Sequence, residues 1–296
     1  MRILLKGFLF ALALIIVGCG SQKETDYKYK IGFVISTLNN PFFVKLKEGA
    51  EDIANVNNVK LTVLDSRNDP IKEQNNVESL IVSGVDLIII NPTDSDAVVK
   101  SVELANNKNI PVITVDRKAA SGKVVCHIAS DNYKGGAMAA EYIIDLLNGK
   151  GNVIELQGIP GTSAARERGK GFNERIKYSD IKVVARQPAN FDRREALVVM
   201  ENLLQRYPNV DAVFAHNDEM ALGAIKAIEE ANKDIYVVGF DGTEDALLAI
   251  KNGRLTATIA QQPSRMGRLA VENAIKYLNG EKVPKNIKVD LLLIKG

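Results

Sequence analysis

Polar and aromatic side chains recur where predicted strands give way to loops or helices. Two carboxylates, two guanidinium groups and several amides are among them, and such groups bind vicinal hydroxyls through paired, charge-assisted hydrogen bonds. Aromatic rings beside them can cover the C–H face of a sugar. The residue types therefore predict a site for a small hydroxylated ligand. In chain order the candidates are Ser36, Asn40, Phe42, Phe43, Asn91, Asp116, Arg117, Arg168, Phe191, Asn217, Asp241 and Gln261.

Each candidate also has a purely structural interpretation. Asp116 and Arg117 could form only a local salt bridge. Asn217 could simply cap a helix, and Asp241 could hold a turn. Asp94 occupies a similar position and is expected to be a cap. For single residues both interpretations stay open, but the shared position after strands favours binding for the set.

Motifs of enzymatic chemistry are missing from the sequence. It has no glycine-rich phosphate-binding loop and no G-x-S-x-G nucleophile elbow. His127 and His216 lie in or directly after apolar runs, and neither has a second histidine at metal-binding spacing. Both are expected to pack in the interior, and Cys126 is expected to be a buried, inert thiol. We therefore expect no enzyme activity, no metal and no cofactor.

The elements that must position the candidates alternate regularly along the chain. Residues 30–43 illustrate the unit: a strand with Phe33 at its centre runs into a polar loop at Ser36, and a helix pattern follows from Phe43. Strands are expected at 30–35, 60–65, 87–91, 111–115, 123–128, 153–156, 181–186, 212–215, 236–239, 256–260 and 287–294.

This alternation, with helices between the strands, predicts an α/β fold. Continuous apolar strands indicate sheets buried on both faces, and the units are too many for one small sheet. Two doubly wound, Rossmann-like lobes are therefore expected, with the ligand beyond the carboxyl ends of the strands. The length of 296 residues suits two domains. A formal net charge of +2 argues against nucleic acid as a partner.

The first residues have the pattern of an export signal. Arg2 and Lys6 precede an apolar run at 8–17, which is shorter than a membrane-spanning helix requires. The run ends at Cys19 in a stretch that resembles the lipobox of bacterial lipoproteins. This resemblance implies a signal peptide over 1–18, a lipidated Cys19 and a polar tether over 19–27. An uncleaved anchor, or an ordinary signal with a chance cysteine, is the alternative.

Several longer stretches are similar to one known family. ISTLNNPFF, INPTDSDA, IPVITVDR, HIASDN, ELQGIPGTSAARERGKGF, QPANFDR, NDEMALGA, VVGFDGT and TIAQQP closely resemble bacterial ribose-binding proteins. These are type I periplasmic binding proteins that deliver sugar to an ABC importer. The resemblance covers the chain from Tyr29 to its end, and it implies two lobes joined by a three-crossing hinge.

The resemblance also implies roles for individual residues. A ribopyranose would stack between Phe42 and Phe43 on one side and Phe191 on the other. Crossings near 130–131, 261–262 and 290–291 would divide the chain into an N-terminal lobe of 28–130 plus 262–290 and a C-terminal lobe of 131–261 plus 291–296. No metal is implied. The implied hydrogen-bonding residues are Asn40, Asp116, Arg117, Arg168, Asn217, Asp241 and Gln261.

Location and partners follow as expectations. A lipidated Cys19 places the protein outside the cytoplasm, anchored to the cell membrane, whereas Gram-negative relatives are free in the periplasm. The expected partners are D-ribose or a close monosaccharide such as allose and an ABC permease, and a monomer is expected. His216 stands where an amide is common in the family. A module that presents sugar to a membrane signalling receptor is an alternative, whereas the export signal argues against a DNA-binding repressor.

Overall fold

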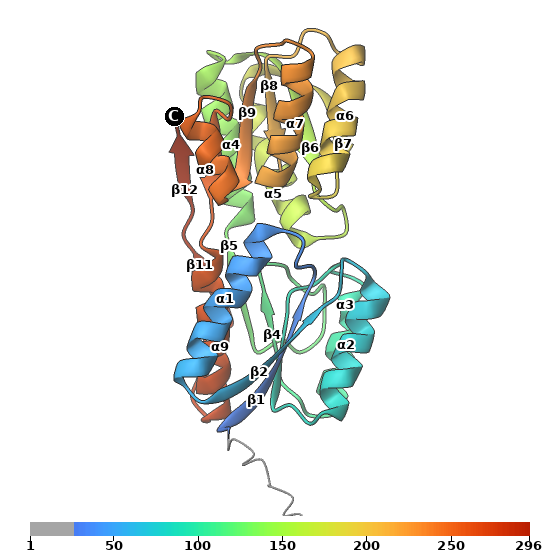
Figure 1. The fold of residues 1–296 in the computed structure, drawn as a ribbon, viewed down its shortest axis with the longest axis vertical. Helices are drawn as coiled ribbons and strands as arrows, with labels where there is room; N and C mark the ends of the chain where they lie inside the picture. Colours follow the sequence, from blue (N-terminus) through green and yellow to red (C-terminus); the bar gives the residue numbers. More distant parts are fainter. Residues whose placement is uncertain (1–26) are drawn as a thin grey trace, which may run out of the picture.

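The computed structural model describes residues 27–296, which form two α/β lobes stacked end to end (Figure 1). The predicted signal peptide, Cys19 and most of the predicted tether lie outside the described residues. Each lobe is built on its own six-stranded sheet, with helices on both faces. The fold class expected from the sequence is confirmed.

The first lobe contains β1 (Tyr29–Ile35), β2 (Val59–Asp65), β3 (Leu87–Ile90), β4 (Val112–Val115), β5 (Cys126–Ser130), β11 (Asn286–Val289), α1 (Pro41–Val56), α2 (Pro70–Val82), α3 (Val98–Asn107) and α9 (Pro263–Leu278). Its sheet has the order β11-β5-β4-β3-β1-β2, and all neighbours are parallel. Helices α1 and α9 pack together on one face, while α2 and α3 cover the other.

The second lobe contains β6 (Lys150–Gln157), β7 (Asp180–Pro188), β8 (Ala212–Ala215), β9 (Tyr236–Asp241), β10 (Ala257–Ala260), β12 (Leu292–Lys295), α4 (Asn132–Leu146), α5 (Ser163–Ile176), α6 (Arg193–Arg206), α7 (Asp218–Glu230) and α8 (Glu244–Lys251). Its sheet has the order β12-β10-β9-β8-β6-β7. Helices α4 and α5 cover one face, and α6, α7 and α8 pack on the other.

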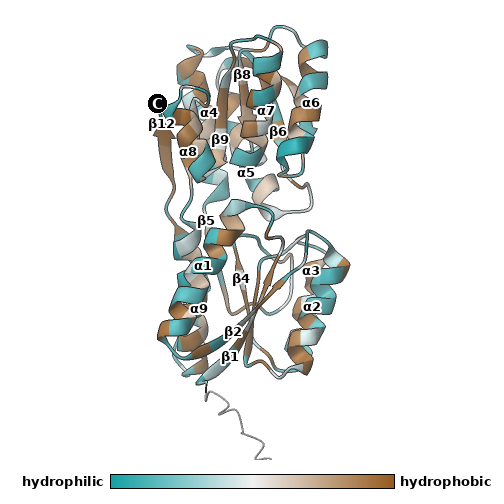
Figure 2. Cartoon of the chain, in the orientation of Figure 1, coloured by the Kyte–Doolittle hydropathy of each residue, from teal (hydrophilic) through white to brown (hydrophobic). Residues whose placement is uncertain are grey.

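The unit β1–α1 shows how the sequence specifies these elements. The strand is buried over its last five residues because helices cover both faces of the parallel sheet. Asn40 then caps the helix, its side chain accepting a hydrogen bond from the backbone of Phe42, and Pro41 occupies the first helical turn. Phe43 and Leu46 are buried against the sheet. Figure 2 shows the same hydrophobic strands and mixed helices throughout both lobes.

The chain passes between the two sheets three times, from β5 to α4, from β10 to α9 and from β11 to β12. Hydrogen bonds link these crossings to one another. The Nζ atom of Lys288 lies 2.7 Å from Oδ2 of Asp131, and the side-chain amide of Gln262 donates to the backbone oxygen of Asp290 over 3.1 Å. The three crossings between the lobes thus form one connected hinge.

The expectation of a single strand over 287–294 is wrong. That stretch is divided between β11, which pairs parallel with β5, and β12, which pairs antiparallel with β10 in the other lobe. The apolar pattern continues through the crossing because both halves pack on a sheet, so the pattern by itself did not mark the break.

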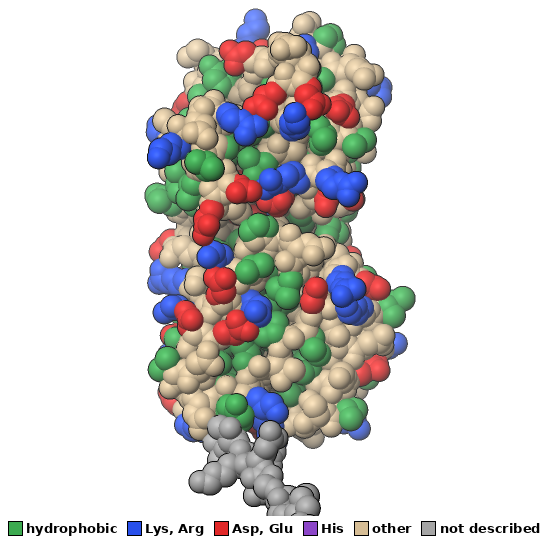
Figure 3. Space-filling model, viewed as in Figure 1, with side chains coloured by type: hydrophobic (Ala, Val, Ile, Leu, Met, Phe, Trp, Pro, Cys, Tyr) green, Lys and Arg blue, Asp and Glu red, His purple; other side chains and the backbone are tan. Residues whose placement is uncertain are grey.

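The charges on the surface are mixed, as the small net charge of +2 suggests. Basic and acidic side chains are interspersed over the visible face of both lobes (Figure 3). Within residues 27–296 no helix combines the length and the apolar character that a membrane crossing needs. Cys126 is buried, as expected, and burial raises the pKa of its thiol to about 11, which disfavours the reactive thiolate.

Candidate functional site

All ten side chains to which the sequence assigned a ligand contact line one cavity between the lobes. Ala164 is the one additional lining residue, and its small apolar side chain gave no signal in the sequence. The complete lining is Asn40, Phe42, Phe43, Asp116, Arg117, Ala164, Arg168, Phe191, Asn217, Asp241 and Gln261.

The first lobe contributes two adjacent rings and one amide from the β1–α1 junction. The rings of Phe42 and Phe43 meet edge to face, with centroids 5.2 Å apart and planes at 88°. Both are buried, and Phe43 also lies under the guanidinium group of Arg117 at 5.1 Å. The Oδ1 atom of Asn40 is used in capping the helix, so its amide nitrogen is the atom left for a ligand.

Asp116 and Arg117 follow β4 directly. The Nε atom of Arg117 lies 3.7 Å from Oδ2 of Asp116, which is an ion pair but too long for a hydrogen bond. The Nη1 atom of Arg117 donates to the backbone oxygen of Pro92 over 3.1 Å. These contacts fix the guanidinium plane against the loop that follows β3.

Ser36 and Asn91, the other two polar candidates, lie behind the cavity and support it. The hydroxyl of Ser36 donates to Oδ1 of Asn91 over 2.6 Å. The amide of Asn91 in turn donates to the backbone oxygen of Val115 over 3.1 Å and approaches Oδ2 of Asp116 at 3.4 Å. They join the carboxyl ends of β1, β3 and β4 into one polar network.

In the second lobe, the Arg168 side chain is held from three sides. Its Nε donates to Oδ1 of Asn132 over 2.8 Å, and its Nη1 donates to the backbone oxygen of His216 over 2.6 Å. The guanidinium group lies 3.8 Å from the centroid of the Phe240 ring. Asn132, at the start of α4, is buried and was not among the sequence candidates. Its side chain contacts Arg168 and does not line the cavity, and no local pattern in the sequence indicates that contact.

Asp241 is the last residue of β9, and Gln261 directly follows the neighbouring strand β10. The amide of Gln261 donates to Oδ1 of Asp241 over 2.8 Å. Asp241 has a positive φ of 127°, an unusual conformation for a residue with a side chain, and Gly242 follows with a φ of 76°. A turn role and a position in the cavity wall therefore coincide at this residue.

Asn217 and Phe191 complete the wall. The Oδ1 atom of Asn217 caps α7 by accepting from the backbone of Met220, and its amide approaches the backbone oxygen of Phe191 at 3.4 Å. The capping interpretation and the cavity interpretation of Asn217 thus hold together. Phe191 also has a positive φ, of 61°. Its ring lies so close to Gly158 that a side chain there would overlap it.

Burial dominates the electrostatics of the cavity. It raises the pKa of Asp116 and of Asp241, while the neighbouring Arg117 and Arg168 act in the opposite direction. Burial likewise lowers the pKa of both arginines, and the carboxylates oppose that shift. Two positive and two negative groups therefore compensate one another where bulk water does not reach.

Three polar atoms of the lining are buried without a hydrogen-bond partner. They are Oδ1 of Asp116, Nε of Arg117 and Oε1 of Gln261. An unpaired buried donor or acceptor costs about 1–3 kcal/mol, so such atoms mark the places where a ligand would bind. Because the set mixes acceptors with a donor, hydroxyl groups, which can play either part, fit it well.

The lobes also contact each other directly beside the cavity. The backbone amide of Ser163 donates to the hydroxyl of Ser95 over 3.0 Å, and the backbone amide of Ser95 donates to the oxygen of Gly161 over 3.0 Å. Nearby, Lys118 pairs with Glu167 at 2.7 Å. These contacts between lobes indicate a closed arrangement.

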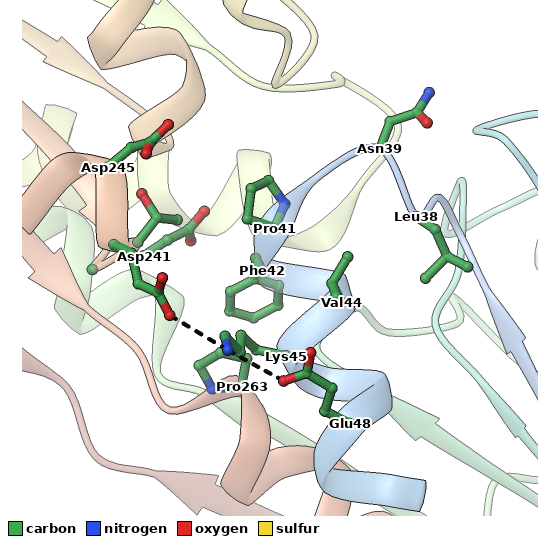
Figure 4. A pocket seen from close by; sticks show the side chains of 13 residues that line it. Leu38, Asn39, Pro41, Phe42, Val44, Lys45, Glu48, Asp241, Asp245 and Pro263 are labelled. Carbon is green, nitrogen blue, oxygen red and sulfur yellow. Dashed lines mark ion pairs between the residues drawn. The ribbon is translucent and has the colours of Figure 1, made fainter.

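A second hollow lies at the rim of the cleft, between the start of α1 and the loop after β9 (Figure 4). Lys45 spans it, 3.2 Å from Oε2 of Glu48 on its own helix and 3.4 Å from Oε1 of Glu244 in the other lobe. Phe42 and Asp241 line both this hollow and the buried cavity.

The histidines do not line the cavity, as the sequence predicted. Both are buried, and burial lowers the pKa of His127 to about 4. Asp94 closes the turn that leads into α3, because its Oδ1 accepts from the backbone amides of Asp96 and Ala97, both over 2.8 Å. It is not the helix cap itself, since the N-cap position is Ala97. In the part of the chain that the structure describes, no three acidic, histidine or cysteine side chains are grouped as a metal site would require.

Comparison with known proteins identifies relatives along nearly the whole chain. Residues 31–282 match the family described as periplasmic binding protein domain. The chain is 52% identical over 280 residues to the ribose import binding protein of Haemophilus influenzae, covering 95% of this chain and 96% of that protein. It is 55% identical over 268 residues to the ribose import binding protein of Escherichia coli, covering 90% of each.

The fold has solved counterparts as well. An ABC transporter periplasmic solute binding protein from Actinobacillus succinogenes, with bound D-allose, superposes with a TM-score of 0.85. It is 32% identical to this chain, and the match covers 90% of this chain and 98% of that one.

Proposed function

This chain belongs to the periplasmic binding protein family, and on that premise we propose that it captures D-ribose between its lobes and delivers it to an ABC import permease. The observation that carries the proposal is the buried cavity between the lobes, where aromatic walls and two compensated carboxylate–guanidinium pairs surround unpaired polar atoms. A monosaccharide offers apolar C–H faces to the rings and hydroxyls to the polar atoms.

In the proposed complex each lobe supplies part of the recognition. Asn40, Asp116 and Arg117 of the first lobe would bind one side of the sugar. The second lobe would bind the other through the residues Arg168, Asn217, Asp241 and Gln261. A ligand that touches both sets stabilises only the closed arrangement, so its binding shifts the protein toward closure. Permease recognition of the closed form would then couple binding to delivery.

Ribose is favoured over other monosaccharides by the degree of similarity. The two ribose import binding proteins are 52% and 55% identical to this chain, whereas the solute binding protein with bound D-allose is 32% identical. Allose carries one more hydroxymethyl group than ribose in its pyranose form. We expect that extra group to weaken the binding of allose relative to ribose.

We further propose that the sugar is bound and returned unchanged. The cavity lining contains no serine, cysteine or histidine that could act as an activated nucleophile or as a base near neutral pH. Its two carboxylates face arginines and an amide, which suits hydrogen bonding to hydroxyls. Prolonged incubation with ribose followed by NMR of the sugar tests this, and any product formed only with the protein would contradict it.

The location is proposed from the sequence. A lipid on Cys19 would hold the protein, as a monomer, on the outer side of the cytoplasmic membrane near its permease. The polar residues between Cys19 and the first lobe would connect the lipid to the fold.

Calorimetric titration of the purified domain against ribose, allose, xylose and arabinose tests the proposed ligand. We expect one ribose per chain, with the other sugars binding at least tenfold more weakly, a difference of about 1.4 kcal/mol. Absence of ribose binding with tight binding of another sugar would replace the ligand, and absence of any sugar binding would contradict the proposed function.

A further inference from the structure

His216 lies directly behind the second-lobe wall of the cavity, at the end of β8 and just before Asn217. Its side chain is completely buried and is not part of the cavity lining. Nothing in the proposed binding of the sugar uses its ring, although a buried histidine is costly unless both ring nitrogens find partners. Both do, and the partners lead back to the cavity.

The hydrogen bonds of the ring define its proton arrangement. The backbone amide of Gly158 can only donate, and it lies 3.3 Å from Nδ1 of His216. Nδ1 must therefore be the acceptor, and the ring proton resides on Nε2. Nε2 lies 2.9 Å from Oε1 of Glu155 and donates to it. The result is a neutral ring held between a carboxylate and a backbone amide.

Glu155 is itself firmly held. Its Oε2 accepts from the amide of Asn173 over 2.8 Å and from Nε of Arg186 over 3.1 Å. Burial acts to raise the pKa of Glu155, but the hydrogen bonds from His216 and Asn173 outweigh it, and the pKa lies below its ordinary value. The ring of His216 is thus anchored to a fixed, ionised group on β6.

From this anchor His216 reaches three members of the cavity wall. Its backbone oxygen accepts from Nη1 of Arg168 over 2.6 Å. Asn217, which is the next residue, caps α7 and turns its amide to the cavity side. Gly158, bonded to the ring, lies against the ring of Phe191. One buried side chain therefore connects to a guanidinium group, an amide and an aromatic wall.

We propose that His216 is a positioning residue for sugar binding, which holds Arg168, Asn217 and Phe191 in their binding arrangement through the Glu155–His216–Gly158 hydrogen bonds. The inference rests on the proposed function and names a residue that does not touch the sugar. It acts by fixing the carbonyl that orients Arg168 and the backbone segment beneath Phe191.

Protonation of the ring would break this arrangement. A second ring proton on Nδ1 would face the amide proton of Gly158, and the acceptor would be lost. The charged groups that act on the ring are Glu155 from β6 and Arg168 from α5, with Arg186 on β7 reaching Glu155. Burial lowers the pKa of His216 and Arg168 lowers it further, while Glu155 opposes them. The neutral form therefore persists below the ordinary histidine range.

Three variants test the proposal. His216→Leu fills the site but removes both hydrogen bonds. His216→Gln keeps a donor for Glu155 and cannot be protonated. His127→Leu is the matched control, because His127 is also buried but bonds to Thr114 in the first lobe, away from the second-lobe wall. Thermal unfolding of each variant accompanies the binding measurements.

We expect His216→Leu to weaken ribose binding by about tenfold to a hundredfold. Without the ring's hydrogen bonds to Glu155 and Gly158, the backbone carbonyl of residue 216 that accepts from Arg168 is no longer held in place. His216→Gln should bind within about threefold of wild type at pH 7, and its affinity should fall less than that of wild type on acidification. His127→Leu should bind within about twofold and keep the wild-type pH profile. Equal losses in His216→Leu and His127→Leu would overturn the proposal.

NMR of the protein without sugar provides a readout that does not depend on ribose. The nitrogen shifts of His216 should show a proton on Nε2 and none on Nδ1, and the side-chain signal of Arg168 should move in both His216 variants but not in His127→Leu. If wild type fails to bind ribose, the proposed ligand is wrong, yet these signals still decide the positioning role. They decide it as well if His216→Leu fails to fold, because His216→Gln remains measurable. A protonated Nδ1 or an unchanged Arg168 signal would refute it.

Discussion

The Nη1 atom of Arg168 lies 3.7 Å from Oδ1 of Asp241, and both side chains are almost completely buried. That distance lets the two charges compensate each other but exceeds a hydrogen bond. Asp241 therefore keeps lone pairs available for a ligand, and Arg168 keeps an N–H group available. In this closed arrangement each charge needs the other, because either charge alone would be buried without compensation.

Replacing Asp241 with alanine is expected to weaken ribose binding by two to four orders of magnitude. Hydrogen bonds to charged groups contribute about 1.5–3 kcal/mol each, so losing two costs about 3–6 kcal/mol. Calorimetric titration measures the loss. Asp245→Ala is the control, because Asp245 is exposed on α8 of the same lobe, where it pairs with Arg193. Binding by Asp241→Ala within a few-fold of wild type would reduce Asp241 to a turn residue.

The Glu73 carboxyl group should make folding stability depend on pH. Burial raises its pKa from 4.5 to about 7, and it accepts from the backbone amide of Thr93 over 2.6 Å. The folded protein thus holds this proton more tightly than the unfolded chain. Stability from this group is complete below pH 4.5 and falls as the pH rises to about 7.

Glu73→Gln removes this titration and keeps an oxygen for Thr93. It should therefore be more stable than wild type at pH 8, by up to about 3 kcal/mol, and close to wild type at pH 4.5. Urea unfolding at the two pH values measures the difference. Glu78→Gln, an exposed change on the same helix, should show no such pH-dependent gain. A wild-type advantage at pH 8 would contradict the expected role of burial.

Gly161→Ala should hinder closure of the lobes. Gly161 lies in the loop before α5, and a side chain there would overlap the carboxylate of Asp94 in the other lobe. Such overpacking costs about 1–3 kcal/mol, so we expect ribose affinity to fall about tenfold to a hundredfold. Small-angle scattering should show a smaller contraction with ribose than wild type at equal sugar concentration.

The double variant Asp94→Ala/Gly161→Ala should recover most of the lost affinity, because the overlapping carboxylate is gone. Asp94→Ala alone reports the cost of losing the two hydrogen bonds that Asp94 accepts in the turn before α3. If the double variant binds no better than Gly161→Ala, the contact between these two residues does not limit closure.

Cys19→Ala should release the protein from membranes or leave its precursor unprocessed. Each acyl chain contributes about 0.8 kcal/mol per buried CH2 group, and stable anchoring needs two chains or one chain with a second signal. Cell fractionation followed by immunoblotting measures the distribution. Wild-type protein that is wholly soluble would disprove the anchor while leaving sugar binding untouched.

Periodicity alone predicted most elements of the fold. Buried parallel strands such as β3 must be apolar on both faces, so each appears in the sequence as a continuous run followed by polar residues. Because the carboxyl ends of parallel strands meet at one edge, the position of Asn40, Asp116 and Asp241 after strands was enough to group them. Arg168 and Phe191 lie further from the strand ends, and there the family resemblance was needed to assign their contacts.

The sequence by itself determined the α/β alternation, the polar and aromatic set and its resemblance to sugar-binding proteins, because these depend on local pattern and residue type. The break between β11 and β12 was missed by the apolar pattern, whereas the family resemblance places a crossing there. Tertiary structure alone decided that Asn132 and His216 hold Arg168 and that Gly161 faces Asp94. Such contacts join residues that lie tens of positions apart. Packing between elements and between lobes sets them, and no short stretch of sequence records which distant partner a side chain will meet.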